Sequence, residues 1–118
     1  GIRKKSIVPK RGKWEEPEYK KSYYPNFPLG SFGHVVSRPV ADYVVQHNDQ
    51  LFNYQGEDVS LGIWLDESPL KDKVQWKKSK RMSNRGNCKD KNLVMIGHNI
   101  PVERMRSCFD HMDEVVLK

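Results

Sequence analysis

The stretch from residue 54 to residue 65, Tyr-Gln-Gly-Glu-Asp-Val-Ser-Leu-Gly-Ile-Trp-Leu, constrains this chain more than any other. Gln-Gly interrupts the backbone, and the residues after it predict a helix over 57–65. Acidic side chains are favoured in a first helical turn, where they complement the dipole and accept unpaired N–H groups. The pattern therefore places Glu57 and Asp58 at the mouth of a helix, either as ordinary N-terminal acids or as a functional pair.

Length and composition allow one domain or less. The chain has 118 residues, of which 36% are hydrophobic and 31% charged, so it can bury only a moderate core. Its net charge is +6, which suits a polyanion, an acidic sugar or plain solubility. No apolar run approaches the ~20 residues of a membrane helix, and no signal-peptide pattern is present. Both ends read as cuts, so we expect a fragment.

The remaining pattern predicts a mixed α and β chain. We expect a strand at 34–36 and then a helix from Ser37, its cap, to about 51, with an apolar stripe of Val40, Ala41, Val44 and Val45. Further strands are predicted at 74–76 and 93–96. A last helix should begin at residue 101, with an apolar stripe of Val102, Met105, Phe109 and Met112.

A carboxylate at a helix mouth suits a general base that takes the proton of a sugar hydroxyl. Asp58 is the candidate base and Glu57 its neighbour; adjacent helical residues do not share a face, so we expect only one to meet the hydroxyl. His98, in a turn after a predicted strand, could ligate a metal. Several aromatic residues could stack on sugar rings or simply fill core or loop space: Trp14, Tyr24, Phe27, Phe32 and Trp64.

Five elements in order resemble the C-terminal half of the family 31 glycosyltransferases, the β-1,3-galactosyl- and β-1,3-N-acetylglucosaminyltransferases. They are Lys13-Trp14, Tyr24-Pro25, the 30–37 stretch Gly-Ser-Phe-Gly-His-Val-Val-Ser, the 57–64 stretch Glu-Asp-Val-Ser-Leu-Gly-Ile-Trp, and Cys88 ahead of 93–98. The resemblance spans about residues 13–112 and is strongest to the proteoglycan-linker galactosyltransferase branch and plant relatives. The 30–37 stretch departs from the family in His34 and in having one small residue fewer.

The resemblance implies an α/β chain that forms the C-terminal part of a GT-A-like fold, with residues 1–118 as its acceptor and catalytic-base part. It implies inverting β-1,3 transfer of galactose or N-acetylglucosamine from a UDP-sugar to a glycan or glycoprotein, with Mn²⁺ as cofactor. It also implies a Golgi membrane enzyme, lumenal side, held by an anchor outside this chain, and no nucleic-acid partner.

Residue by residue, the resemblance makes Asp58 the base, with Glu57 beside it, and His98 a ligand of Mn²⁺. It assigns the acceptor side to Tyr24, Pro25, Gly30, Gly33 and Trp64. The family's Asp-x-Asp motif is absent from the sequence. We therefore expect a donor-binding half outside these residues, and no catalysis by this chain alone.

Two alternatives stay open. The chain could be a basic module that binds a polyanion, or a non-catalytic truncated scaffold. The two cysteines, Cys88 and Cys108, could pair with each other, pair elsewhere or stay as thiols.

Overall fold

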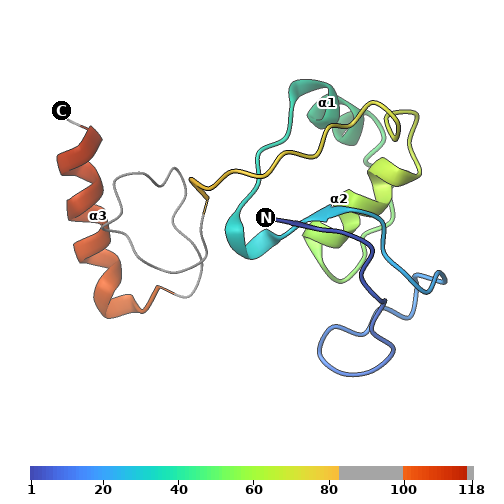
Figure 1. Ribbon diagram of the computed structural model, residues 1–118, viewed down its shortest axis with the longest axis horizontal. Coiled ribbons are helices and arrows are strands. Elements are labelled where there is room, and N and C mark those ends of the chain that lie inside the picture. The colour runs from blue at the N-terminus through green and yellow to red at the C-terminus, as the bar shows by residue number, and fades with distance from the viewer. Residues whose placement is uncertain (83–99, 117–118) are drawn as a thin grey trace. The chain divides into compact units, whose positions relative to one another are not determined.

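The computed structural model describes residues 1–82 and 100–116, apart from the side chains of 111–116 (Figure 1). The chain divides into two units. The larger consists of residues 2–30 and 34–77, and the smaller consists of Gly1 with residues 31–33 and 78–118. Asp58, Glu57 and the residues that contact them belong to the larger unit.

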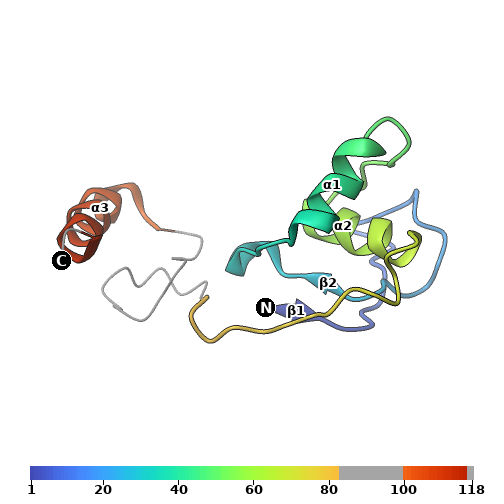
Figure 2. The ribbon, with the colours of Figure 1, turned by 90° about the horizontal axis from the view of Figure 1, so that it is seen from above.

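A short antiparallel sheet brings the N-terminal segment against residues 22–28. Strand β1 (Ile2–Arg3) pairs with β2 (Phe27–Pro28), in the register Ile2 with Pro28 and Arg3 with Phe27 (Figure 2). The pairing continues beyond the strands, where the N–H of Tyr24 donates to the carbonyl of Ser6 at 2.8 Å. The proline-rich stretch is therefore held by the N-terminus.

Helix α1 (Arg38–Gln46) begins near where the sequence places it and ends five residues early. Proline occupies its first turn as expected, although the side chain of Ser37 makes no capping hydrogen bond. Val40 is buried and Val44 packs beside it, whereas Val45 is 69% exposed. Of the predicted apolar stripe, Val40 and Val44 therefore face the core, whereas Val45 faces solvent.

Helix α2 (Glu57–Asp66) confirms the predicted helix and lies between two apolar clusters. On one side Ile63, fully buried, packs with Val8, Tyr19, Tyr24 and Phe27. On the other side Leu61 and Leu65 pack with Val40 of α1. A helix that is apolar on most of its circumference must be covered on most sides, and α2 is the element around which this unit is built.

Gly62 allows α2 to approach β2 closely. A Cβ atom at this position would lie 2.7 Å from the carbonyl oxygen of Asn26 and would also strike Phe27. Real side chains do not tolerate that separation, so the packing of helix on strand requires glycine.

The 3-10 turn η1 (Gly30–Phe32) begins at Gly30 of the larger unit, and its other two residues belong to the smaller unit. The smaller unit also contains helix α3 (Val102–Val116). Val102, Met105 and Phe109 are exposed, and the side chain of Met112 lies outside the described residues. Cys108 is buried and disulfide-bonded. The sequence has one other cysteine, Cys88, which is also outside the described residues.

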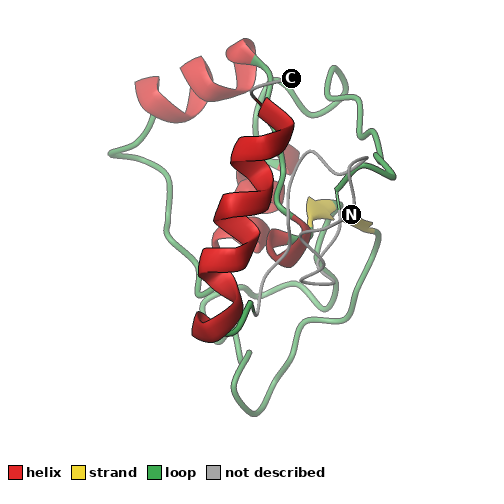
Figure 3. Cartoon of the chain, turned by 90° about the vertical axis from the view of Figure 1, so that its left-hand side faces the viewer, coloured by secondary structure: helices red, strands yellow, loops and turns green. Residues whose placement is uncertain are grey.

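Two predicted strands are wrong. Residues 34–36 and 74–76 are irregular, and Val35 is 81% exposed. Short apolar runs form strands only where a partner supplies the ladder, and neither segment pairs with a strand among the described residues. Val74 and Trp76 instead pack against the α1–α2 cluster. The predicted strand at 93–96 falls outside the described residues. In the part described, the α/β character rests on α1, α2, α3 and the two-stranded sheet (Figure 3).

Candidate functional site

Asp58 lies in the first turn of α2, half-buried, with both carboxylate oxygens engaged by backbone amides. Oδ2 accepts a hydrogen bond from the N–H of Gly30 at 3.0 Å, and Oδ1 accepts one from Val59 at 2.7 Å. A carboxylate has about four lone-pair positions, so two N–H donors fix its orientation and leave it able to accept a further proton donor.

Glu57 shares the surroundings of Asp58. A Cβ atom on Gly30 would strike Oε1 of Glu57 and would lie 3.4 Å from Oδ2 of Asp58. Both carboxylates therefore approach the same glycine, although neighbouring helical side chains diverge by about 100°. The sequence assigned Gly30 to the acceptor side; the structure places its amide on the candidate base.

Gln55 fastens the loop before α2 to the N-terminal part of the chain. Its backbone N–H donates to Oε2 of Glu16 at 2.6 Å, and its side-chain amide donates to the carbonyl of Lys13 at 2.7 Å. Glu16 is buried, 6% exposed, and its carboxylate stabilises this loop through the hydrogen bond from Gln55. Sequence reasoning missed both residues, because the two bonds join positions 39 and 42 residues apart and no local spacing reveals them.

Tyr24 lies in the apolar core rather than on an open surface. It is 7% exposed and stacks on Tyr19, with ring centroids 5.4 Å apart. Burial, followed by the charges of Glu16, Tyr19 and Asp58, raises the pKa of Tyr24 to about 12. Pro25 next to it is half-buried. Acceptor roles for both stay predictions, and the structure gives Tyr24 a packing role beneath the site.

Trp64 lies near the C-terminal end of α2, about 9 Å of helical rise from Asp58. Its indole N–H donates to the carbonyl of Phe52 at 2.7 Å. It lines a pocket of about 230 Å³ together with Tyr43, His47, Gln50, Leu51, Phe52, Tyr54 and Glu67. Trp64 therefore lies away from Glu57 and Asp58 along the helix, and its acceptor role stays a prediction.

Gly33 adopts a positive φ of 66°, a conformation that favours glycine. It belongs to the smaller unit.

His98, the predicted metal ligand, lies outside the described residues. Among the residues that are described, no group of three His, Cys, Asp or Glu side chains could hold a metal ion. Mn²⁺ as a cofactor stays a prediction.

About half of the chain is similar in sequence to β-1,3-glycosyltransferases. The relatives are UDP-GalNAc:beta-1,3-N-acetylgalactosaminyltransferase 2 from several vertebrates. The Mus musculus protein is 47% identical over 58 residues, 49% of this chain and 11% of the relative. The Homo sapiens protein is 45% identical over 58 residues, with the same coverage. The Danio rerio protein is 46% identical over 64 residues, 54% of this chain and 13% of the relative.

The chain thus matches only about a tenth of the length of these relatives. No family model matches the chain, and no solved structure does. Within the described residues, no helix is both long and apolar enough to span a bilayer.

Proposed function

We propose that the protein containing this chain is a UDP-sugar-dependent, inverting β-1,3-hexosyltransferase with Asp58 as general base. The observation that carries the proposal is the 43–47% identity to the vertebrate N-acetylgalactosaminyltransferases. The name of these relatives favours N-acetylgalactosamine as the donor sugar, over the galactose or N-acetylglucosamine that the sequence resemblance implied. We propose further that the donor-binding part of this transferase lies outside residues 1–118.

The chemistry of Asp58 follows from its contacts. In an inverting transfer, an acceptor hydroxyl attacks the anomeric carbon, its proton passes to the base, and the bond from that carbon to the UDP oxygen breaks. The Gly30 and Val59 amides hold the carboxylate still, and its remaining lone pairs are free to receive the hydroxyl proton. A general base of this kind contributes about 10²–10⁴ to the rate.

The proposal also includes Mn²⁺, with His98 as one of its ligands. When bound, a divalent cation would supply positive charge to the leaving diphosphate. If His98 helps to hold it, His98→Ala in the full-length protein should weaken Mn²⁺-dependent donor binding. An unchanged metal titration would reject that role.

We further propose a glycan or glycoprotein acceptor and a lumenal Golgi location, with a membrane anchor outside this chain. Fluorescent tagging of the full-length protein, combined with protease protection of its catalytic part, tests the location. A cytosolic catalytic part would contradict it.

The direct test is a donor panel with the full-length protein. UDP-GalNAc, UDP-Gal and UDP-GlcNAc are offered with a mixture of oligosaccharide acceptors, and the product linkage is read by NMR. We expect a β-1,3 product from one of the three donors, with UDP-GalNAc the best. A protein that binds polyanions and transfers no sugar from any donor would instead support the basic binding module.

A further inference from the structure

The first fourteen residues carry six cationic side chains and no acidic one. All six are exposed, and within the described part of the chain none forms an ion pair: Arg3, Lys4, Lys5, Lys10, Arg11 and Lys13. Elsewhere in the larger unit, Lys21, Arg38 and Lys71 do meet carboxylates. No ion pair of the described residues therefore holds these cations, although the exposed Glu15 and the buried Glu16 follow directly in the sequence.

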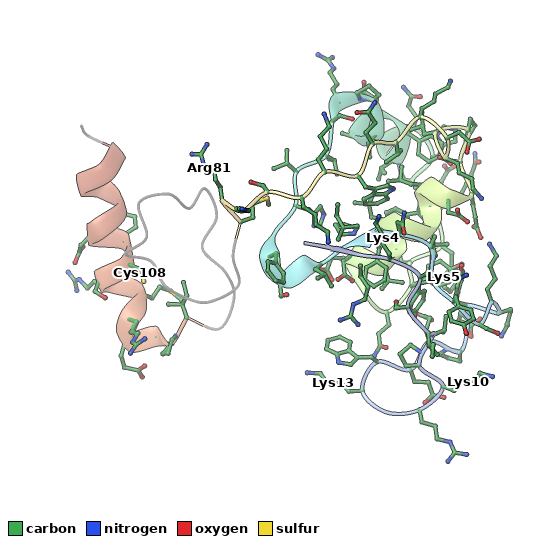
Figure 4. The ribbon with its side chains drawn as sticks, viewed as in Figure 1. Lys4, Lys5, Lys10, Lys13, Arg81 and Cys108 are labelled. Atoms are coloured by element: carbon green, nitrogen blue, oxygen red, sulfur yellow. The ribbon has the colours of Figure 1, made fainter. Side chains whose placement is uncertain are left out.

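Part of this charge stands on a closed loop, residues 9–16, which we call the basic loop. The N–H of Glu16 donates to the carbonyl of Pro9 at 3.2 Å, and the N–H of Glu15 donates to that of Gly12 at 3.0 Å. Gly12 has a φ of 90°, which favours glycine at this turn. Figure 4 shows Lys10 and Lys13 on the two sides of the loop. The two backbone hydrogen bonds thus fix the conformation of the loop that carries Lys10, Arg11 and Lys13.

The basic loop is anchored next to the candidate base. Gln55 bonds the carbonyl of Lys13 and the carboxylate of Glu16, and it precedes Asp58 by three positions. Three residues span at most about 11 Å. Lys13 and its neighbour Trp14 are therefore held at the N-terminal end of α2, where the acceptor hydroxyl must arrive if Asp58 is the base.

Trp14 supplies a flat apolar surface at this place. It is 62% exposed, and the ammonium group of Lys13 lies 4.8 Å from its ring centroid. Most of this large ring is therefore accessible to a ligand. A large aromatic ring beside a cation suits a ligand that combines a weakly apolar face with negative charge.

We propose that Lys13 and Trp14 form an acceptor platform that selects a glycan bearing an anionic group. A sugar ring stacks on Trp14, while Lys13, aided by Lys10, meets a sulfate, phosphate or carboxylate on that ring or its neighbour. The inference rests on the proposed function, because it assigns the platform to the acceptor that Asp58 deprotonates.

The test uses the full-length protein and a neutral oligosaccharide acceptor paired with analogues that carry one sulfate, one phosphate or one uronate carboxylate. We expect a lower KM for an anionic acceptor, with similar kcat. Lys13→Ala should remove about two- to fivefold of that preference, as for one exposed charge contact. Trp14→Ala should raise KM for neutral and anionic acceptors alike by about three- to tenfold. Which analogue gains most identifies the anion.

Lys73→Ala is the matched control, since Lys73 is exposed and forms no ion pair among the described residues; it should leave the preference unchanged. A second readout needs no turnover: quenching of tryptophan fluorescence by the anionic oligosaccharide, lost in Trp14→Phe. Normal transfer with equal KM values and no Trp14-dependent quenching overturns the platform. Quenching without transfer from any UDP-sugar keeps the platform and rejects the proposed transferase.

Discussion

The two ends of α2 differ in what they hold and in how they are held. At the N-terminal end, the Asp58 carboxylate is fixed by amides from two segments, and Gln55 joins the adjoining loop to the basic loop. At the C-terminal end, Trp64 is tied to Phe52 beside an aromatic pocket. The first end carries a carboxylate held by two backbone amides, whereas the second carries an aromatic pocket that His47 and Glu67 also line. Under the proposed function, the general base acts at the first end.

The sharpest way to break this distinction is to compare Asp58→Asn with Trp64→Phe in the full-length protein. We expect Asp58→Asn to lower kcat by about 10²–10⁴ with UDP binding kept, because the proton acceptor is lost. Trp64→Phe keeps a ring and should leave kcat nearly unchanged. Rates from a donor assay and UDP titration measure both. If the two variants lose activity equally, the functional separation of the ends is wrong.

The middle of α2 couples both ends to the sheet. Gly62→Ala should destabilise the protein by about 1–3 kcal/mol, as expected for overpacking, because its Cβ would meet the backbone at Asn26. Urea unfolding measures the loss, with Gln46→Ala on the exposed face of α1 as control. Wild-type stability in Gly62→Ala would show that helix and strand can separate at no cost.

Tyr24, which packs beneath the N-terminal end, makes stability sensitive to alkali. Its pKa is raised from 10.0 to about 12, chiefly by burial, so the folded state keeps the proton longer than the unfolded state. Its contribution is complete below pH 10 and is lost as pH rises towards 12, by up to about 2 kcal/mol. Tyr24→Phe should flatten this part of the stability curve measured by urea unfolding. An equally steep loss in Tyr24→Phe would assign it to other groups.

The smallest expected effect is on the pKa values of Tyr24 and Tyr54, which sense charges at different ends of α2. After burial, the charges that raise the pKa of Tyr24 include Glu16 and Asp58, whereas Glu67 is the first of those that raise the pKa of Tyr54. Asp58→Asn should therefore lower the Tyr24 pKa and spare Tyr54, and Glu67→Gln should do the reverse. Ultraviolet titration with Tyr→Phe references resolves the two. Equal responses would mean that both rings sense both ends.

The sequence was informative where one local signal sufficed. Glu57 and Asp58, followed by apolar residues, predicted α2 and its N-terminal end. Pro39 predicted the start of α1. The strands at 34–36 and 74–76 failed because an apolar run does not carry its pairing partner. The contacts of Glu16 and Gln55 could not be predicted, since each depends on a fold that closes almost forty residues. Gly30 was selected as a site residue, but its role as donor to Asp58 emerged only in three dimensions.

Gln55 also makes the site vulnerable to chemical ageing. Its side-chain amide is the donor that secures Lys13. Deamidation would turn that amide into a carboxylate, which only accepts hydrogen bonds and would face a carbonyl oxygen across 2.7 Å. One hydrolysed side chain would thus release the Lys13 tether while every atom of Asp58 stayed intact.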